Sequence, residues 1–294
     1  MAETKVKNSN LWSLGWALII VGAVFSAVQA MQPKGPEMTW RRVRMDGHRA
    51  GAQSVTAENA ATALGAFSDE GYRTPSGVLY AADSPMGKVA SAMMEVQPRL
   101  APLKVVIGHS ARMMMNDRDN PDLPLGNLFA DVLRDYASRY FKRPMDFAIT
   151  NFGGIRVPMP EGAVTMEDIS SMFPFKNYLC HVKMTGASLT KLLEQLAATP
   201  AFQATSGATV RVKAHKLESA LVGGKPIDPQ RVYHVATIDF LLDGGDNLRI
   251  GALAQDVTLS HVLLRDVMLQ YVEAMEAAGK LVDSASDGRV IMED

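Results

Sequence analysis

Residues 151–156 (Asn-Phe-Gly-Gly-Ile-Arg) follow a predicted strand and place an amide, two glycines and a guanidinium in one short loop. Glycines allow a ligand to approach the backbone closely. The guanidinium of Arg156 could bind a phosphate or a carboxylate through two parallel N–H groups. Taken alone, the loop is equally well explained as a strand-ending turn with an incidental arginine.

A second loop, residues 240–246 (Phe-Leu-Leu-Asp-Gly-Gly-Asp), also follows a predicted strand. Its adjacent glycines require a tight turn that presents Asp246 as a hydrogen-bond acceptor, which suits a pair of ligand hydroxyls. A hairpin turn, or an aspartate that orders its own loop, is the commoner explanation for an isolated Asp-Gly-Gly-Asp. The spaced carboxylates and the distal glutamate of a calcium loop are missing, so calcium binding is not predicted.

Two loop phenylalanines, Phe175 and Phe240, could form a clamp for a flat ligand. Phe175 stands in Phe173-Pro174-Phe175, after a predicted helix, where an aromatic beside a proline usually packs in the core. Phe240 occupies a similar loop position, and two phenyl faces about 7 Å apart would hold one planar ring by stacking. Core packing and a clamp both stay open at this point.

The elements that position these loops alternate irregularly between strand and helix. Apolar side chains at helical spacing predict a helix over residues 125–141, and Thr165 with Asp168 three residues later has the pattern of a capping box. The other predicted helices cover residues 84–100, 187–198 and 260–278, and the predicted strands cover residues 103–108, 146–150, 178–184, 208–213 and 232–237. Because strict βαβ alternation is absent, we predict an α+β fold.

The overall composition narrows the functional classes. The chain has 294 residues, of which 47% are hydrophobic and 21% charged, so disorder, a disulfide scaffold and a multispan membrane protein are not expected. With 30 basic and 31 acidic side chains the net charge is −1, and no nucleic-acid partner is expected because no chain-wide field would hold DNA or RNA. The single Cys180 excludes an intramolecular disulfide.

Residues 1–30 have the pattern of a signal peptide or an N-terminal anchor. Two lysines precede the almost wholly apolar residues 11–28, and Val28-Gln29-Ala30 fits a signal-peptidase site. We therefore expect export to the periplasm or the cell surface. Cleavage is favoured over membrane anchoring through residues 11–28, although a stretch of that length is just sufficient to span a bilayer.

Five segments resemble, in order and spacing, the C-terminal, substrate-binding domain of the 5′-nucleotidase family, which includes UDP-sugar hydrolases. They are Leu125 to Asp131, Asn151 to Arg156, Pro174-Phe175, Met184 to Gly186 and Asp239 to Asp246. The resemblance covers residues 103–294 and implies a layered α/β/β/α domain there. Residues 31–102 are interpreted as a linker, a small extended segment and a connecting helix.

The resemblance implies a substrate-binding role for individual side chains. Phe175 and Phe240 resemble the pair that sandwiches the nucleobase, and Asp246 resembles the acceptor for the ribose hydroxyls. Asn151 would hydrogen-bond the base, and Arg156 would reach toward the ribose and the phosphate. Together these groups would bind a nucleotide or a nucleoside.

Family members also place an arginine shortly before the Gly-Asn-Leu segment. In this chain Arg118 is the nearest candidate for that substrate-binding position, and Arg112 is the second.

We expect no catalytic residue and no metal ligand on this chain. The full family enzyme hydrolyses phosphate esters in a separate N-terminal domain with two metal ions, which need clustered Asp, His and Asn ligands. Only His48 lies in an Asp-x-His context (Asp46-Gly47-His48), and no histidine lies in a Gly-Asn-His-Glu or Gly-His-x-His context. This one cluster cannot supply enough ligands, and too few residues precede Leu103 for such a domain. Divalent metals are therefore expected only on a partner metallophosphatase chain.

The leading hypothesis is an exported nucleotide- or nucleoside-binding domain that acts in nucleotide catabolism or scavenging with that partner. A surface interaction module with the same fold and no ligand is one alternative. A self-sufficient nucleotide phosphohydrolase with an unrecognised metal site is the other. Residues 46–51 and 72–77 resemble an extension found in standalone bacterial members of the group, for which we have no mechanism.

Overall fold

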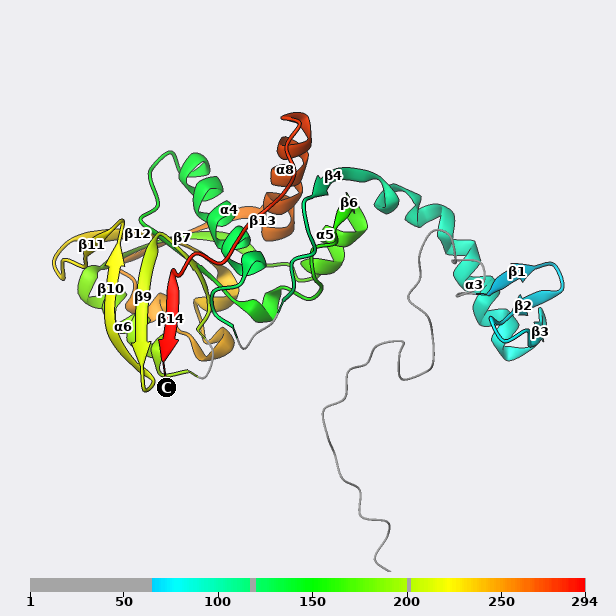
Figure 1. Ribbon diagram of the computed structural model, residues 1–294, viewed down its shortest axis with the longest axis horizontal. Helices are drawn as coiled ribbons and strands as arrows, with labels where there is room; N and C mark the ends of the chain where they lie inside the picture. Colours follow the sequence, from blue (N-terminus) through cyan, green and yellow to red (C-terminus); the bar gives the residue numbers. More distant parts are fainter. Residues whose placement is uncertain (1–64, 117–119, 200–201, 294) are drawn as a thin grey trace, which may run out of the picture. The chain divides into compact units, whose positions relative to one another are not determined.

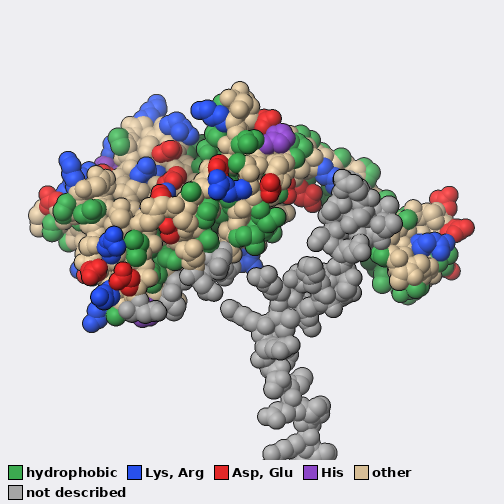
Figure 2. Space-filling model, viewed as in Figure 1, with side chains coloured by type: hydrophobic (Ala, Val, Ile, Leu, Met, Phe, Trp, Pro, Cys, Tyr) green, Lys and Arg blue, Asp and Glu red, His purple; other side chains and the backbone are tan. Residues whose placement is uncertain are grey.

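The computed structural model describes residues 65–116, 120–199 and 202–293, which fall into two compact units divided after Ser91 (Figure 1). The predicted leader, residues 1–30, lies outside the described residues. Within the described ranges, no helix combines the length and the apolar character needed to cross a membrane. Basic and acidic side chains are interspersed over the face shown in Figure 2, in keeping with the net charge of −1.

The first unit contains a small antiparallel sheet and the start of a helix. Strands β1 (Ala66–Ser68), β2 (Gly71–Arg73) and β3 (Leu79–Ala81) pair in sequence order. Helix α3 (Pro85–Leu100) follows, and the Ser84 hydroxyl accepts a hydrogen bond from the Gly87 N–H at 3.0 Å. A hydroxyl at this position satisfies one of the free N–H groups of the first turn, which explains why the helix begins here.

The second unit is built on a five-stranded mixed sheet. Its strand order is β13 (Asp256–Leu263), β7 (Tyr178–Thr185), β12 (Val232–Ile238), β5 (Phe147–Thr150) and β8 (Ala204–Ser206). Strand β12 runs parallel to β5 and antiparallel to β7. All four residues of β5 are buried, so other elements cover both faces at the centre of the sheet.

Helices pack against this sheet through apolar faces. Helix α4 (Pro124–Tyr140) contacts β5, β8 and β12, and helix α6 (Gly186–Ala197) contacts β7 and β12. Leu125, Phe129 and Leu133 of α4 are buried, which confirms the amphipathic helix predicted there. Burial of each such side chain contributes about 1.5–3 kcal/mol, so tertiary packing is the main source of stability for this helix.

Further elements complete the second unit. A four-stranded sheet has the order β11 (Lys225–Pro226), β10 (Lys216–Val222), β9 (Ala208–Lys213) and β14 (Val290–Glu293), and α6 also contacts its strand β10. The remaining elements are β4 (Val106–Ser110), β6 (Gly162–Thr165), α5 (Met166–Met172), α7 (Ile250–Leu253) and α8 (Leu264–Ala277). Thr165 and Asp168 close the predicted capping box at α5.

Two predicted boundaries differ from the structure. The predicted helix over residues 260–278 begins only at Leu264, because residues 260–263 are the end of strand β13, whose pairing with β7 is interrupted by an irregularity and resumes at Leu263. The predicted strand over residues 103–108 begins later, at Val106, because Ala101–Lys104 form a 3-10 turn. The first boundary is decided by pairing between residues far apart in the sequence and the second by a local 3-10 turn, and hydrophobicity reports neither.

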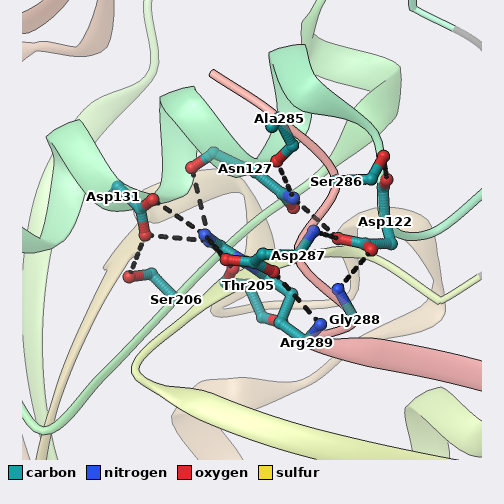
Figure 3. Close-up of polar contacts among 10 residues, drawn as sticks. All are labelled: Asp122, Asn127, Asp131, Thr205, Ser206, Ala285, Ser286, Asp287, Gly288 and Arg289. Carbon is teal, nitrogen blue, oxygen red and sulfur yellow. Dashed lines mark hydrogen bonds and ion pairs between the residues drawn. The ribbon is translucent and has the colours of Figure 1, made fainter.

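A polar network ties the C-terminal segment to the start of α4 (Figure 3). The Arg289 guanidinium binds both carboxylate oxygens of Asp131, at 2.8 and 2.9 Å, and also Asp287 at 2.7 Å. The Asn127 amide donates to the Asp122 carboxylate at 2.7 Å and to the Ala285 carbonyl at 3.0 Å. Asn127 and Asp131, both in the segment Leu125 to Asp131, therefore connect helix α4 to the C-terminal segment.

Candidate functional site

A cleft of about 230 Å³ opens at one edge of the five-stranded sheet. It is lined by Asn151, Gly153, Gly154, Arg156, Phe175, Asn177, Phe240 and Asp246. The parallel strands β5 and β12 both end at this edge, and the antiparallel strand β7 begins there. The three loops that carry these residues are therefore brought together by the pairing of the strands.

The two phenylalanines of the cleft are partly open to solvent. Phe175 is 49% exposed and Phe240 is 44% exposed, so neither is a core residue. The Asp239 carboxylate accepts hydrogen bonds from the backbone N–H groups of Tyr178 and Phe240, both at 2.9 Å. This carboxylate therefore links the loop before β7 to the loop after β12, and it holds the two aromatic segments in place.

The turn that carries Asp246 has an unusual backbone. Asp246 and Asn247 adopt φ angles of 48° and 62°, in the left-handed region that L-residues seldom occupy. At Gly245 a Cβ atom would collide with the Phe240 carbonyl and ring, so only glycine fits there. The paired glycines therefore allow the turn to pack against Phe240 and to present Asp246 at the cleft.

Asn151 and Asp246 contact each other across the cleft. The Asn151 Nδ2 donates to Asp246 Oδ2 at 2.7 Å, and Asn151 is only 4% exposed. Asn151 Oδ1 is buried and accepts no hydrogen bond from the described residues. This arrangement orients the carboxylate and leaves its second oxygen, Asp246 Oδ1, as an acceptor for a ligand.

Arg156 supplies the positive charge of the cleft. Its Cζ atom lies 5.8 Å from the centroid of the Phe175 ring, and its Nη1 donates to the Gly153 carbonyl at 3.3 Å. Across the described ranges, no carboxylate forms an ion pair with this guanidinium. An anionic group in the cleft could therefore bind it without displacing a salt bridge.

Of the two upstream arginines, only Arg112 belongs to the described residues, and it does not line the cleft. Arg118 lies outside the described residues. Arg112 donates from Nη2 to Asp283 Oδ2 at 2.7 Å, an exposed pair that lowers the pKa of Asp283 through the hydrogen bond. Arg112, the second candidate, is thus engaged elsewhere on the surface.

Sequence reasoning missed two residues of this site. Asn177 lines the cleft, and Asp239 joins its loops although it makes no predicted ligand contact. The available signal for Asn177 was its position in the Phe175 loop, where an amide two residues from an exposed aromatic can contact the same ligand. Asp239 begins one of the five resembling segments, but no local signal gave it a role, because its partner Tyr178 lies in a different loop.

In the described part of the chain, no group of three or more His, Cys, Asp or Glu side chains could hold a metal ion. His181 and His234 hydrogen-bond each other at 2.9 Å on β7 and β12, and neither lines the cleft. The residues that line the cleft offer aromatic rings, hydrogen-bonding groups and one positive charge, which suit a planar, partly anionic ligand.

Comparison with protein families and relatives identifies the domain. The family model described as "5′-nucleotidase, C-terminal domain" matches residues 106–254. Protein UshA of Escherichia coli (strain K12) is 28% identical over 150 residues, covering 50% of this chain and 27% of that protein. The cell wall protein Lmo0130 of Listeria monocytogenes is 29% identical over 189 residues, covering 59% of this chain and 24% of that protein. The aligned part thus spans about a quarter of each relative's length.

Solved structures share the fold. The 5′-nucleotidase precursor from Thermus thermophilus superposes with a TM-score of 0.62 at 21% identity, covering 74% of this chain and 46% of that chain. The NAD nucleotidase from Haemophilus influenzae superposes with a TM-score of 0.53 at 19% identity, covering 74% and 42% of the two chains. The predicted α+β fold is confirmed.

Proposed function

Because the chain belongs to the 5′-nucleotidase family through its C-terminal domain, we propose that its cleft binds nucleosides and nucleotides and serves nucleotide catabolism. One observation carries the proposal: two exposed aromatic rings, a guanidinium without a carboxylate partner among the described residues, and an oriented carboxylate line the same small cleft. A nucleotide needs this combination, because it joins a planar base, two hydroxyls and an anionic phosphate.

Each part of the ligand has a matching group in the proposed complex. The base stacks between Phe175 and Phe240, where stacking on an aromatic side chain contributes about 1–3 kcal/mol. The ribose hydroxyls donate to the Asp246 carboxylate, which Asn151 already holds at 2.7 Å. Arg156 lies on the phosphate side, and the amides of Asn151 and Asn177 face the base.

Hydrolysis itself we assign to a separate metallophosphatase chain that holds the divalent metals. Attack of water on a phosphate ester is accelerated by metal ions that clamp the attacking and leaving oxygens. The cleft described above supplies groups that bind and orient, and its one carboxylate is engaged by Asn151. In this division of work, the present chain captures the nucleoside part and the partner cleaves the phosphate.

We further propose that the chain works outside the cytoplasm in nucleotide scavenging. The leader pattern of residues 1–30 supports export, and one relative is itself named a cell wall protein. Periplasmic or cell-surface location follows, with the leader either removed or kept as an anchor through residues 11–28. Comparing the mass of the exported protein with that of the precursor distinguishes removal from retention.

Isothermal titration calorimetry with adenosine and AMP tests the binding proposal. We expect both ligands to bind, and Phe240→Ala and Asp246→Ala to weaken binding at least tenfold, a loss of about 1.4 kcal/mol or more. Tyr140→Ala is the matched control, because Tyr140 is 45% exposed and lies outside the cleft. Absence of heat with any nucleotide at millimolar concentration would refute the proposal.

Two outcomes would favour the alternatives. Capture of a protein partner, together with failure to bind nucleotides, would indicate an interaction module. Release of phosphate from AMP by this chain alone, with Mn²⁺ or Zn²⁺ added, would indicate a self-sufficient phosphohydrolase.

A further inference from the structure

The loop of residues 151–156 is held by a side chain that does not itself line the cleft, that of Asn116. Met114, two residues before Asn116, exchanges backbone hydrogen bonds with Met159 at 3.1 and 3.0 Å. These methionines are 1% and 0% exposed, so the bridge between them is part of the core. It therefore fixes where the Asn116 side chain begins.

The Asn116 amide crosses from this bridge to two carbonyl groups of the loop. Its Nδ2 lies 2.5 Å from the Ile155 oxygen and 3.4 Å from the Phe152 oxygen. Because both partners are acceptors, the NH₂ group must face them and Oδ1 must point away. Oδ1 is buried and has no hydrogen-bond donor among the described residues. The donors of this amide are thus used entirely on the loop backbone.

The backbone N–H groups at the two ends of the loop are also engaged. The Phe152 N–H donates to the Gln203 side-chain oxygen at 2.9 Å, and the Arg156 N–H donates to the Met172 carbonyl at 3.0 Å. Asn116 donates to two carbonyl groups of the same turn, those of Phe152 and Ile155, which lie between the cleft residues Asn151 and Arg156. Within the turn, the Gly154 and Ile155 N–H groups donate to the Asn151 and Phe152 carbonyls, both at 3.1 Å. Without Asn116 the turn would keep these bonds and lose the side-chain contact to the Ile155 carbonyl.

We propose that Asn116 is a positioning residue for nucleotide binding, an inference that rests on the proposed function. It fixes the loop that carries the Asn151 amide and the Arg156 guanidinium, and it makes no contact with the ligand. Small displacements of oriented binding groups cost much of their effect. We therefore expect Asn116 to control how well Arg156 meets the phosphate side of the ligand.

Two variants separate the hydrogen bonds from the shape of the side chain. Asn116→Ala removes both bonds, and Asn116→Asp keeps the shape but places an oxygen against two carbonyl oxygens. Loss of two hydrogen bonds corresponds to roughly tenfold weaker AMP binding, with a smaller change for adenosine, which lacks the phosphate. Asn120→Ala is the matched control and should leave both affinities unchanged, because the exposed Asn120 side chain bonds, among the described residues, the Asp122 N–H at 3.0 Å and no other group.

Hydrogen exchange on the ligand-free, full-length protein provides a readout independent of binding. The amides of residues 152–156 should exchange faster in both Asn116 variants than in the wild type and in Asn120→Ala. In an Arg156→Ala background, Asn116→Ala should weaken AMP binding clearly less than tenfold, because the guanidinium that meets the phosphate is already gone and only the effect through Asn151 remains. A purely structural role would lower the melting temperature without this coupling.

Unchanged exchange, unchanged AMP affinity of both Asn116 variants, or the same tenfold loss in the Arg156→Ala background would each overturn the inference. If the wild type binds neither AMP nor adenosine, the proposed function fails instead. The exchange experiment then still decides whether Asn116 fixes the loop.

Discussion

A histidine pair on neighbouring strands should make the folded state sensitive to acid. His181 Nε2 and His234 Nδ1 lie 2.9 Å apart, and His234 Nε2 lies 3.4 Å from Arg143 Nη1. Arginine only donates, so His234 accepts at Nε2 and donates from Nδ1 to His181. Protonating either ring therefore breaks a hydrogen bond and adds positive charge close to Arg143 and Lys183.

The magnitude follows from the pKa of His181. Burial lowers this pKa from 6.5 to about 4, with smaller contributions from His234 and Arg143, and the side chain is only 4% exposed. Below pH 6.5 the unfolded chain takes up a proton that the folded chain excludes until about pH 4. The free energy of unfolding therefore has its full value above pH 6.5 and decreases as the pH falls, by about 3 kcal/mol at pH 4. Burial lowers the pKa of His234 as well, in the same direction.

Urea unfolding at about pH 7.5 and about pH 4.5 measures this loss. His181→Gln keeps an acceptor for the His234 N–H and cannot titrate. We expect the wild type to lose about 2–3 kcal/mol more than this variant between the two pH values. His261→Gln, at an exposed position on β13, is the control and should lose as much as the wild type. Equal losses in the wild type and His181→Gln would refute the explanation.

Two further substitutions test the polar network around Arg289 (Figure 3) and the turn that carries Asp246. Arg289→Met leaves the Asp131 and Asp287 carboxylates without their partner and should lower the free energy of unfolding by about 3 kcal/mol in urea titrations, because this guanidinium is only 13% exposed. The exposed Arg112→Met should cost much less, and a comparable loss in both would contradict the distinction. Asn247→Gly should raise the melting temperature slightly, because a φ of 62° costs a non-glycine residue about 0.5–1 kcal/mol and glycine adopts it without strain. The AMP affinity should stay unchanged. A lower melting temperature would show that the left-handed turn is not strained.

Much of the fold was predictable because its signals are local. The apolar stripe of α4 and the capping box at Thr165 depend on residues a few positions apart, and both are confirmed. The short strands were harder. Local spacing predicts a helix from residue 260, where the structure has the end of strand β13, because the pairing of β13 with β7 joins residues far apart in the sequence, such as Leu263 and Tyr178.

The cleft residues were predictable for a different reason. Each of the three loops carries its own chemical signature, and the family resemblance assigned their order to one site. The structure places all five of the described candidates in one cleft, and their proposed ligand contacts stay predictions. Asn177 and Asp239 were missed, because a single amide or carboxylate in a loop is indistinguishable from a solvated one until its partners are known.

The sequence alone therefore determined which side chains are available: two loop aromatics, a guanidinium, an amide and a glycine-supported aspartate. It also determined the helices and the family resemblance, because these depend on local spacing and on the order of the motifs. Only the tertiary structure decided that Asn151 orients Asp246, that Asp239 joins the aromatic loops, and that Asn116 fixes the glycine turn. The physical reason is that the decisive hydrogen bonds join residues 39, 61 and 95 positions apart, and only strand pairing and core packing bring such residues together.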